Sequence, residues 1–252
     1  SSVGGAIECF NSRLFIDNTE FSNNVAYSQG GAIYLYQSIS RVDSCQFINN
    51  SATGNVGVGG AIKVNGYVGV DSLFIDNSSF INNYSHGTGG AIDGNSYPQN
   101  AANYVEINNC LFAKNTAYSG ADIYTGGTYI INNTTISGGE TLSSTSHNKS
   151  LVFNGGELVL LNSIVWDNTL PYLIESYNNN ELTVAYSCTI EEQDGPGNIT
   201  ENPLFCFPDS INYTLNEISP CIGTGQNGSN MGAFGIGCDN TDINPPLLSI
   251  DN

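Results

Sequence analysis

One four-residue word, Gly-Gly-Ala-Ile, returns along the first half of this 252-residue chain. It stands at 4–7, 30–33, 59–62 and 89–92, and a degenerate copy, Gly-Ala-Asp-Ile, stands at 120–123. Successive isoleucines are therefore separated by 26, 29, 30 and 31 residues. A drifting period in this range is typical of proteins built from stacked repeats, each of which contacts only its neighbours. The paired glycines fit a corner with positive φ or with close backbone approach, where a Cβ is not tolerated.

A second word, Phe-x-Asn-Asn, allows the repeats to be aligned in columns. The phenylalanine position holds Phe21, Phe47, Phe80, Phe112, Ile136, Val165 and Ile190. Five residues earlier stand the mostly aliphatic Ile16, Val42, Ile75, Ile107, Ile131, Leu160 and Ala185. Three residues earlier stand Asn18, Ser44, Asn77, Asn109, Asn133, Asn162 and Ser187. Apolar and polar residues alternate within each copy, which predicts strands. We expect the apolar columns to point inward and the Asn column to form an inward ladder of hydrogen-bonded amides at a bend.

Repeats this short cannot each bury an apolar face, so the chain is expected to coil. Each repeat then becomes one rung, and rungs stack about 4.8 Å apart through parallel strand pairing. The sequence therefore predicts an all-β fold, a single-stranded parallel β-helix (solenoid) of about seven to nine rungs.

The domain organisation follows from where these patterns fade. We expect one parallel β-helix over residues 1–238, with the rungs in 1–194 and a closing segment in 195–238. Residues 239–252 contain Asn244-Pro245-Pro246 and are expected to form an extended tail or linker. Beyond the prolines, Leu247, Leu248, Ser249 and Ile250 would add a strand to the next copy in a head-to-tail filament. The alternative is that both ends are cuts in a longer polypeptide whose other parts cap the solenoid.

The combination of Gly-Gly-Ala-Ile with Phe-x-Asn-Asn resembles the repeat of the chlamydial polymorphic outer-membrane proteins. The resemblance covers about residues 4–124, and weaker rungs continue to about residue 190. It implies a right-handed parallel β-helix on the cell surface. Four later stretches, 202–205, 213–215, 219–222 and 231–235, are similar to the closing segment of many secreted bacterial β-helix proteins. Some of those carry a sorting domain, and some are polysaccharide-active enzymes.

The charge balance restricts the partners. Five Lys and Arg residues stand against 23 Asp and Glu residues, so the formal net charge is −18. Phosphate binding needs concentrated cations, which excludes nucleic acid and acidic membrane surfaces. Acidic polysaccharides are disfavoured for the same reason unless calcium bridges them. No apolar run approaches the roughly 20 residues of a membrane helix, so we expect a chain that does not span a membrane.

One column of carboxylates is the strongest candidate for chemistry. Asp17, Asp43 and Asp76 lie four residues before the phenylalanine position and are followed by Asn108 and Asn132. They alternate with the inward aliphatic column and should point outward. One interpretation is a polysaccharide lyase or glycoside hydrolase with these three Asp residues as catalytic groups or as calcium ligands.

The other interpretation is that Asp tolerates a strand end before a turn and faces water. We favour this second interpretation because the chain has few cations and no Lys or His completes a catalytic site. We therefore assign no catalytic residue, no metal ligand and no cofactor, with calcium at the Asp column as the alternative.

Six of the seven cysteines fall into two groups. Cys45, Cys110 and Cys188 are expected to be small buried residues. Cys206, Cys221 and Cys238 are clustered in the closing segment, and one disulfide among these three is expected, with the pairing left open.

Acceptor triplets for N-glycosylation are the remaining candidate modification sites. The candidates are Asn49, Asn83, Asn148, Asn198, Asn212 and Asn227. Asn77 and Asn133 also begin such triplets but are expected to lie in the inward ladder.

We expect a non-enzymatic, secreted protein of the extracellular space or cell surface, with a structural or adhesive role. Its expected partners are other copies of itself, other surface proteins, or glycans. Besides the enzyme, the alternative is a carbohydrate-binding module that uses some of the 14 Tyr and 11 Phe residues.

Overall fold

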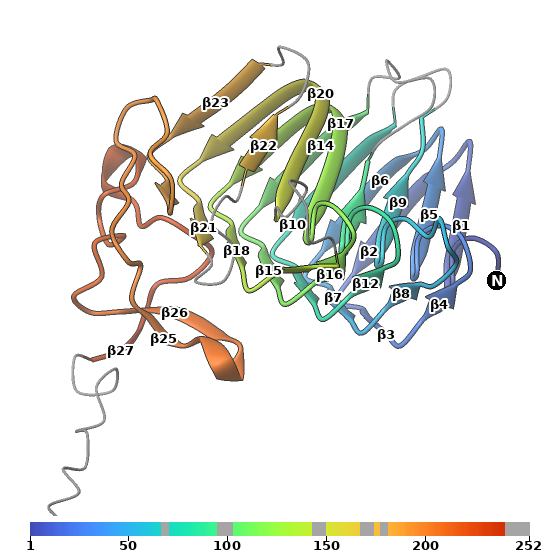
Figure 1. Cartoon of the computed structure of the whole chain (residues 1–252), viewed down its shortest axis with the longest axis horizontal. Coiled ribbons are helices and arrows are strands. Elements are labelled where there is room, and N and C mark those ends of the chain that lie inside the picture. The colour runs from blue at the N-terminus through green and yellow to red at the C-terminus, as the bar shows by residue number, and fades with distance from the viewer. Residues whose placement is uncertain (67–70, 95–102, 143–149, 167–173, 177–180, 240–252) are drawn as a thin grey trace, which may run out of the picture.

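A computed structural model describes residues 1–66, 71–94, 103–142, 150–166, 174–176 and 181–239. Almost all regular structure in these residues is β-strand, and the strands stack as the rungs of a parallel solenoid (Figure 1). The predicted parallel β-helix is thereby confirmed. Among the described residues, no helix is long and apolar enough to cross a membrane.

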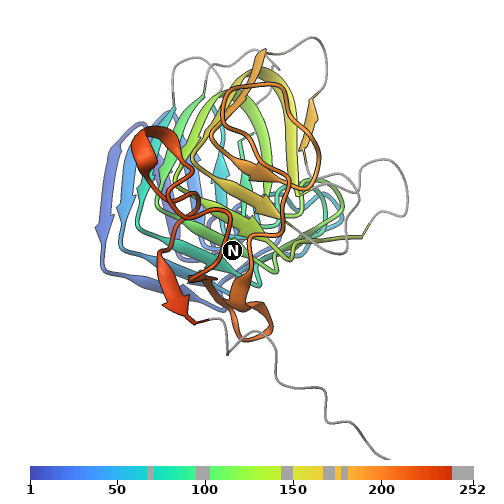
Figure 2. The ribbon, with the colours of Figure 1, turned by 90° about the vertical axis from the view of Figure 1, so that its left-hand side faces the viewer.

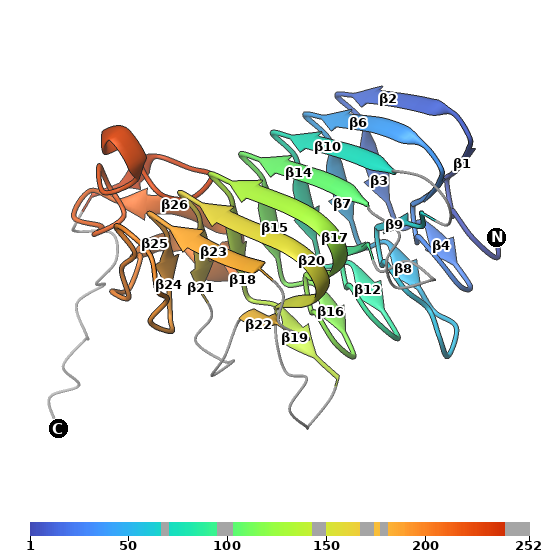
Figure 3. The same cartoon turned by 90° about the horizontal axis from the view of Figure 1, so that it is seen from above.

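The largest sheet has twelve strands in two branches that meet at β17. The first branch contains β1 (Ile7–Phe10), β5 (Ile33–Tyr36), β9 (Ile62–Val64) and β13 (Ile92–Asp93). The second branch contains β2 (Arg13–Asp17), β6 (Ile39–Asp43), β10 (Ser72–Asp76) and β14 (Tyr104–Asn108). Both pair with β17 (Ile123–Asn132), and the sheet continues through β20 (Leu151–Leu161), β22 (Ile174–Ser176) and β23 (Glu181–Ala185). Figure 3 shows the second branch from above, with its strands following one another along the solenoid.

Two further sheets complete the coil. The seven-stranded sheet contains β3 (Glu20–Ser22), β7 (Gln46–Ile48), β11 (Ser79–Ile81), β15 (Leu111–Ala113), β18 (Thr135–Ser137), β21 (Ile164–Trp166) and β24 (Cys188–Thr189). The five-stranded sheet contains β4 (Val25–Ala26), β8 (Ser51–Ala52), β12 (Tyr84–Ser85), β16 (Thr116–Ala117) and β19 (Glu140–Thr141). Within the described residues, five turns carry a strand in all three sheets, slightly fewer than predicted, because the third sheet ends at β19.

The phenylalanine column forms the centre of the core, as predicted. Phe21, Phe47, Phe80 and Phe112 stack face to face, with ring centroids 4.9, 4.7 and 4.7 Å apart and interplanar angles of 8°, 1° and 2°. All four rings are buried. Parallel register sets this spacing, because each phenylalanine is the direct partner of the next one along the solenoid.

The alignment of the last rung was wrong by one residue. Val165 pairs with Thr189, not with Ile190, and the residue with positive φ is Tyr186 in place of Ser187. Val184, not Ala185, pairs with the inward Leu160. A shift of one residue in strand pairing exchanges the inward and outward side chains of a strand. The observed pairing places Val184 in the core.

The two asparagines of Phe-x-Asn-Asn have different roles. The first has a left-handed backbone, with φ of 57° at Asn23, 56° at Asn49 and 54° at Asn82. Asn is one of the few residues that adopt this conformation readily. The second asparagine points inward and forms the ladder Asn24, Asn50, Asn83 and Asn115.

Each rung of this ladder is held by several hydrogen bonds. The backbone N–H and Nδ2 of Asn50 both donate to Oδ1 of Asn83 at 3.0 Å. The same groups of Asn83 donate to Oδ1 of Asn115 at 2.9 and 3.0 Å. Nδ2 of Asn83 also donates to the carbonyl oxygen of Phe47 at 2.9 Å. The ladder therefore satisfies buried backbone groups at the corner between the second and third sheets.

The predicted ladder column has another role. Asn18, Asn77 and Asn109 are exposed, with φ of 47°, 49° and 54°. The prediction of an inward amide ladder in this column was therefore wrong. Asn is present there because it adopts a left-handed turn at low cost, not because its amide is needed inside.

The glycine pairs meet both predicted requirements. Gly30 has φ of +62°, and a Cβ on Gly31 would lie 2.0 Å from the carbonyl oxygen of Gly60 in the next rung. The first glycine is therefore needed for conformation and the second for close approach between rungs.

The ladder ends after Asn115. Two residues there, Gly139 and Asp122, depart from the repeat pattern, and the second fills the space left by the first. The position after Asn115 in the ladder is Gly139, because Thr116 pairs with Glu140. Asp122, from the degenerate Gly-Ala-Asp-Ile word, accepts a hydrogen bond from Nδ2 of Asn115 at 2.8 Å. A Cβ on Gly139 would lie 2.5 Å from Oδ2 of Asp122, so the aspartate occupies the space of the missing asparagine.

The closing segment packs beside the later rungs (Figure 2). It contains β25 (Phe205–Phe207), η1 (Pro208–Ser210), β26 (Asn212–Asn216), η2 (Gln226–Gly228) and β27 (Ile236–Cys238). Its Leu215 and Met231 pack against Ile164 and Trp166 of β21. A disulfide joins Cys206 to Cys238, one of the pairings that the sequence left open.

The remaining described cysteines are free and buried, including the three predicted to be small core residues. Cys221 lies against Cys188, and the hydrogen bond between their thiols, together with burial, raises the pKa of Cys188.

Candidate functional site

The outer face of β2, β6, β10 and β14 brings the predicted acidic column together. Strand register places Asp17, Asp43, Asp76, Asn108 and Asn132 in one line, each the partner of the next. Asp17 is exposed, and the side chains of Asp43 and Asp76 keep 33% and 20% of their accessible surface. The column points outward, as predicted from the alternation of the strands.

Repulsion within this column is relieved by neighbouring protein groups. Nη2 of Arg41 lies 3.0 Å from Oδ2 of Asp76 and 4.0 Å from Oδ2 of Asp43. Nδ2 of Asn77 donates to Asp43 at 3.0 Å, and Nδ2 of Asn108 donates to Asp76 at 3.2 Å. Two successive rungs therefore each supply an amide to the carboxylate of the rung before. Sequence reasoning missed this role of Arg41, although its position beside both carboxylates was readable from the alignment.

The electrostatics of Asp43 do not resemble those of a general acid. The hydrogen bond from Asn77 lowers the pKa of Asp43 below its ordinary value, and Ser44 and Arg41 lower it further. A carboxyl that donates a proton near neutral pH needs the opposite shift. Across the described part of the chain, no group of three or more His, Cys, Asp or Glu residues is placed to hold a metal ion. Calcium binding by Asp17, Asp43 and Asp76 stays a hypothesis.

Replacing Asp43 with Asn gives a pH-dependent test of these contacts. Because the folded-state pKa is lowered, the carboxylate stabilises the fold above the ordinary Asp pKa of about 3.9. This contribution is lost as the pH falls through the folded-state pKa. We expect a small decrease in Tm at neutral pH, since the group is exposed, and convergence of variant and wild type in acid.

Asp17→Asn is the matched control, because Asp17 heads the same column without the arginine contact. Thermal melts from pH 7 into acid measure both variants. A large loss of Tm for Asp43→Asn that persists in acid would contradict the outward, solvent-facing role of the column.

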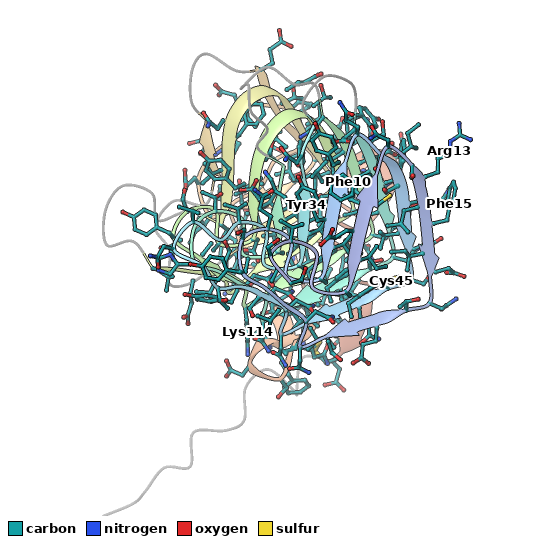
Figure 4. The ribbon with its side chains drawn as sticks, turned by 90° about the vertical axis from the view of Figure 1, so that its right-hand side faces the viewer. Phe10, Arg13, Phe15, Tyr34, Cys45 and Lys114 are labelled. Atoms are coloured by element: carbon teal, nitrogen blue, oxygen red, sulfur yellow. A yellow bond between two sulfur atoms is a disulfide. The ribbon has the colours of Figure 1, made fainter. Side chains whose placement is uncertain are left out.

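Aromatic rings and arginines share this face with the carboxylates. Phe15 is 71% exposed, and it stands in one outward column with Arg41 and Phe74. The ring of Phe74 lies 5.8 Å from that of Tyr104 in the next rung. Figure 4 shows Arg13 and Phe15 projecting from the ribbon into solvent. We call Arg13, Phe15, Arg41, Phe74 and Tyr104 the aromatic–arginine face.

A hollow lies between the five-stranded sheet and η1. It has a volume of about 640 Å³, and Tyr84, Lys114, Glu140 and Asp209 contribute to its lining. Nζ of Lys114 donates to the carbonyl oxygen of Asp209 at 2.8 Å, which ties the closing segment to this corner. The hollow combines both signs of charge but lies away from the predicted acidic column.

The predicted modification and assembly sites have different environments. Asn49 and Asn227 are exposed. Asn198 and Asn212 are partly buried, and Nδ2 of Asn198 donates to the carbonyl oxygens of Val184 and Gln193.

Asn83 lies buried in the ladder, where both atoms of its amide are used, so it has no surface for a glycan. Asn77, expected inside, is exposed. Asn148 and the predicted assembly strand Leu247, Leu248, Ser249 and Ile250 lie outside the described residues, and the filament stays a prediction.

One family profile matches the chain. Residues 18–36 match the Chlamydia polymorphic membrane protein repeat, a span that runs from Asn18 through one Phe-x-Asn-Asn word to one Gly-Gly-Ala-Ile word. Comparisons with curated proteins and with solved structures give no significant match. The chain thus carries a repeat of the Chlamydia polymorphic membrane protein type, folded as a parallel β-helix.

Proposed function

We propose that this chain is an extracellular, cell-surface β-helix with an adhesive role, and that its aromatic–arginine face binds a glycan. The family whose repeat it carries is named for membrane proteins, which supports a place at the cell surface. The disulfide Cys206–Cys238 supports an oxidising compartment outside the cytosol.

The observation that carries the proposal is a group of one exposed and two half-buried aromatic rings beside charged groups on one continuous sheet face. Phe15 offers an exposed ring to the apolar side of a sugar, and the half-buried rings of Phe74 and Tyr104 extend this apolar surface. Arg41 and Asp43 offer hydrogen bonds to hydroxyl groups beside them. Small-ligand sites commonly combine aromatic side chains with a few polar groups.

The repeat itself favours a linear glycan. Equivalent outward positions recur along the solenoid about every 4.8 Å, a spacing comparable with one hexose unit of an extended polysaccharide. A net charge of −18 repels anionic chains, so the face favours neutral or cationic glycans.

Retention on immobilised polysaccharides tests the proposal. We expect wild-type protein to bind a neutral or cationic member of a panel that also contains anionic chains. The double variant Phe15→Ala, Phe74→Ala should bind about tenfold more weakly or worse, because aromatic contacts contribute on the order of 1 kcal/mol each. Tyr27→Ala is the matched control, since Tyr27 is 64% exposed and follows β4 on another part of the surface.

Two outcomes would contradict a glycan-binding face: no retention on any polysaccharide, or an equal loss for the Tyr27 control. The same panel, incubated with and without calcium, separates adhesion from catalysis. New reducing ends or unsaturated products that disappear in Asp43→Ala or Asp76→Ala would support the alternative of a polysaccharide lyase or glycoside hydrolase.

A further inference from the structure

Two oppositely charged side chains, Lys63 and Asp93, meet in a buried position on the first branch of the twelve-stranded sheet. Lys63 on β9 and Asp93 on β13 are direct register partners on neighbouring parallel strands. Nζ of Lys63 lies 2.5 Å from Oδ1 of Asp93, and the two side chains keep only 6% and 1% of their accessible surface. In a chain with five cations, one is therefore placed in a dry environment against a carboxyl group.

A hydroxyl group, two tyrosines and a second carboxyl group surround this pair. The hydroxyl of Thr88 donates to Oδ2 of Asp93, whereas the ion pair with Lys63 is made by Oδ1. By register the pair is flanked by Tyr34 on one side and by Tyr124 on the other. A second carboxyl, Asp71, is fully buried nearby, where burial raises its pKa and the charge of Lys63 acts against that shift.

The fold holds the amine of Lys63 against the carboxyl group of Asp93 in a place that is almost closed to water. Removing an ammonium and a carboxylate from water costs several kcal/mol for each ion, and their attraction repays this only in part. Transfer of one proton from Nζ to the carboxylate leaves a neutral amine in contact with a neutral acid. The fold thus holds a nucleophile against an acyl group, and this fixed contact replaces the encounter of two separate molecules.

We propose that Lys63 and Asp93 condense to form an isopeptide bond between β9 and β13. The lone pair of Nζ attacks Cγ of Asp93, and negative charge develops on Oδ2, where the Thr88 hydroxyl donates its hydrogen bond. The Cγ–Oδ1 bond then breaks, and Oδ1 takes up protons from Nζ and leaves as water. Oδ2 becomes the carbonyl oxygen of the new amide. The step joins an amine and an acid with loss of one water and needs no oxidant, reductant or co-reactant.

The product explains why these residue types stand in this column. The equivalent positions in the neighbouring rungs are Tyr34 and Tyr124, neither of which bears a charge at neutral pH. An amide in place of the two ions removes both buried charges and links two consecutive rungs through their side chains. The rungs are 30 residues apart in sequence, so the link also closes a long loop of the unfolded chain.

Trypsin digestion of the reduced, alkylated and denatured full chain tests the bond directly. Trypsin does not cleave after a lysine whose amine is acylated, and the flanking cleavage sites are Arg41 and Lys114. We expect one peptide spanning 42–114, lighter by one water than its sequence, in place of separate peptides 42–63 and 64–114. The intact reduced chain should also be lighter than its sequence by one water. Two separate peptides and an unaltered intact mass would overturn the proposal.

Variants then assign the roles. Lys63→Met should restore the mass expected from its own sequence, whereas Lys114→Met, a change at a lysine that contacts Asp209 and not Asp93, should leave the missing water unchanged. Thr88→Val keeps the side-chain shape without the hydroxyl, and we expect a mixture of linked and unlinked chains soon after synthesis. Complete linkage in Thr88→Val from the first time point would contradict the role given to Thr88. Digestion of the wild type decides the main question even where a variant fails to fold.

Discussion

Replacing Phe80 with alanine is expected to lower the free energy of unfolding by about 3–5 kcal/mol. The Phe80 ring is fully buried, and its centroid lies 4.7 Å from that of Phe47 and 4.7 Å from that of Phe112. Backbone pairing on both sides fixes the rung spacing, so the neighbours cannot move together to fill the cavity. Chemical denaturation of wild type and variant measures the difference.

Phe15→Ala is the control for this change, because it deletes the same ring from a position that is 71% exposed. A surface substitution of this kind should change the free energy of unfolding by about 0.5 kcal/mol or less. Similar losses for Phe80 and Phe15 would mean that the stacked column does not form the core.

The second large effect is expected at Asn83, within the inward ladder. Replacing Asn83 with glycine removes an acceptor used by two groups of Asn50 and donors used by Phe47 and Asn115. Each buried group left without a partner costs about 1–3 kcal/mol. We therefore expect a loss of more than about 3 kcal/mol, or failure to fold, measured by denaturant melts and by yield of soluble protein.

The preceding residue provides an unusually close control. Asn82 is exposed and has φ of 54°, a conformation that glycine adopts without strain. Asn82→Gly should therefore be nearly neutral, although it is the same substitution one position away. If the two variants lose equal stability, the separate roles assigned to the two asparagines of the word are wrong.

The repeat columns show what the sequence could predict and what it could not. Column alignment placed Phe21, Phe47, Phe80 and Phe112 inside and the Asp43 column outside, because strand alternation has a period of two and leaves one choice of face. The amide ladder was placed in the wrong column. Asn suits both a left-handed turn and a ladder, so its recurrence at a bend does not reveal which property is used.

The error in the last rung has a related cause. Ala185, Ser187 and Ile190 fit the column consensus as well as Val184, Tyr186 and Thr189 do, and the Gly-Gly word that fixes the register elsewhere is missing there. Only pairing with β20 and β21 selects the second set.

The candidate site was predictable in part. The Asp column could be placed on an outer face, but the contact of Arg41 with Asp76 depends on side-chain reach across rungs. The contact between Lys63 and Asp93 was not predicted, because neither residue belongs to a repeated word. Aligning the repeats on the isoleucine of Gly-Gly-Ala-Ile would have put them in adjacent rows of one column. Their burial could not have been foreseen, since their strand positions alternate with the inward residues.

The disulfide in the closing segment determines how this end of the protein transmits mechanical load. A pull along the backbone passes from Cys206 to Cys238 through the sulfur atoms, so residues 207–237 carry none of the tension. Those residues would otherwise release on the order of 100 Å of extended backbone. The contacts that Leu215 and Met231 make with β21 are thus shielded from force, and the last rungs keep their cover while the chain is under tension. The solenoid would thus retain this cover under loads that stretch an unlinked segment.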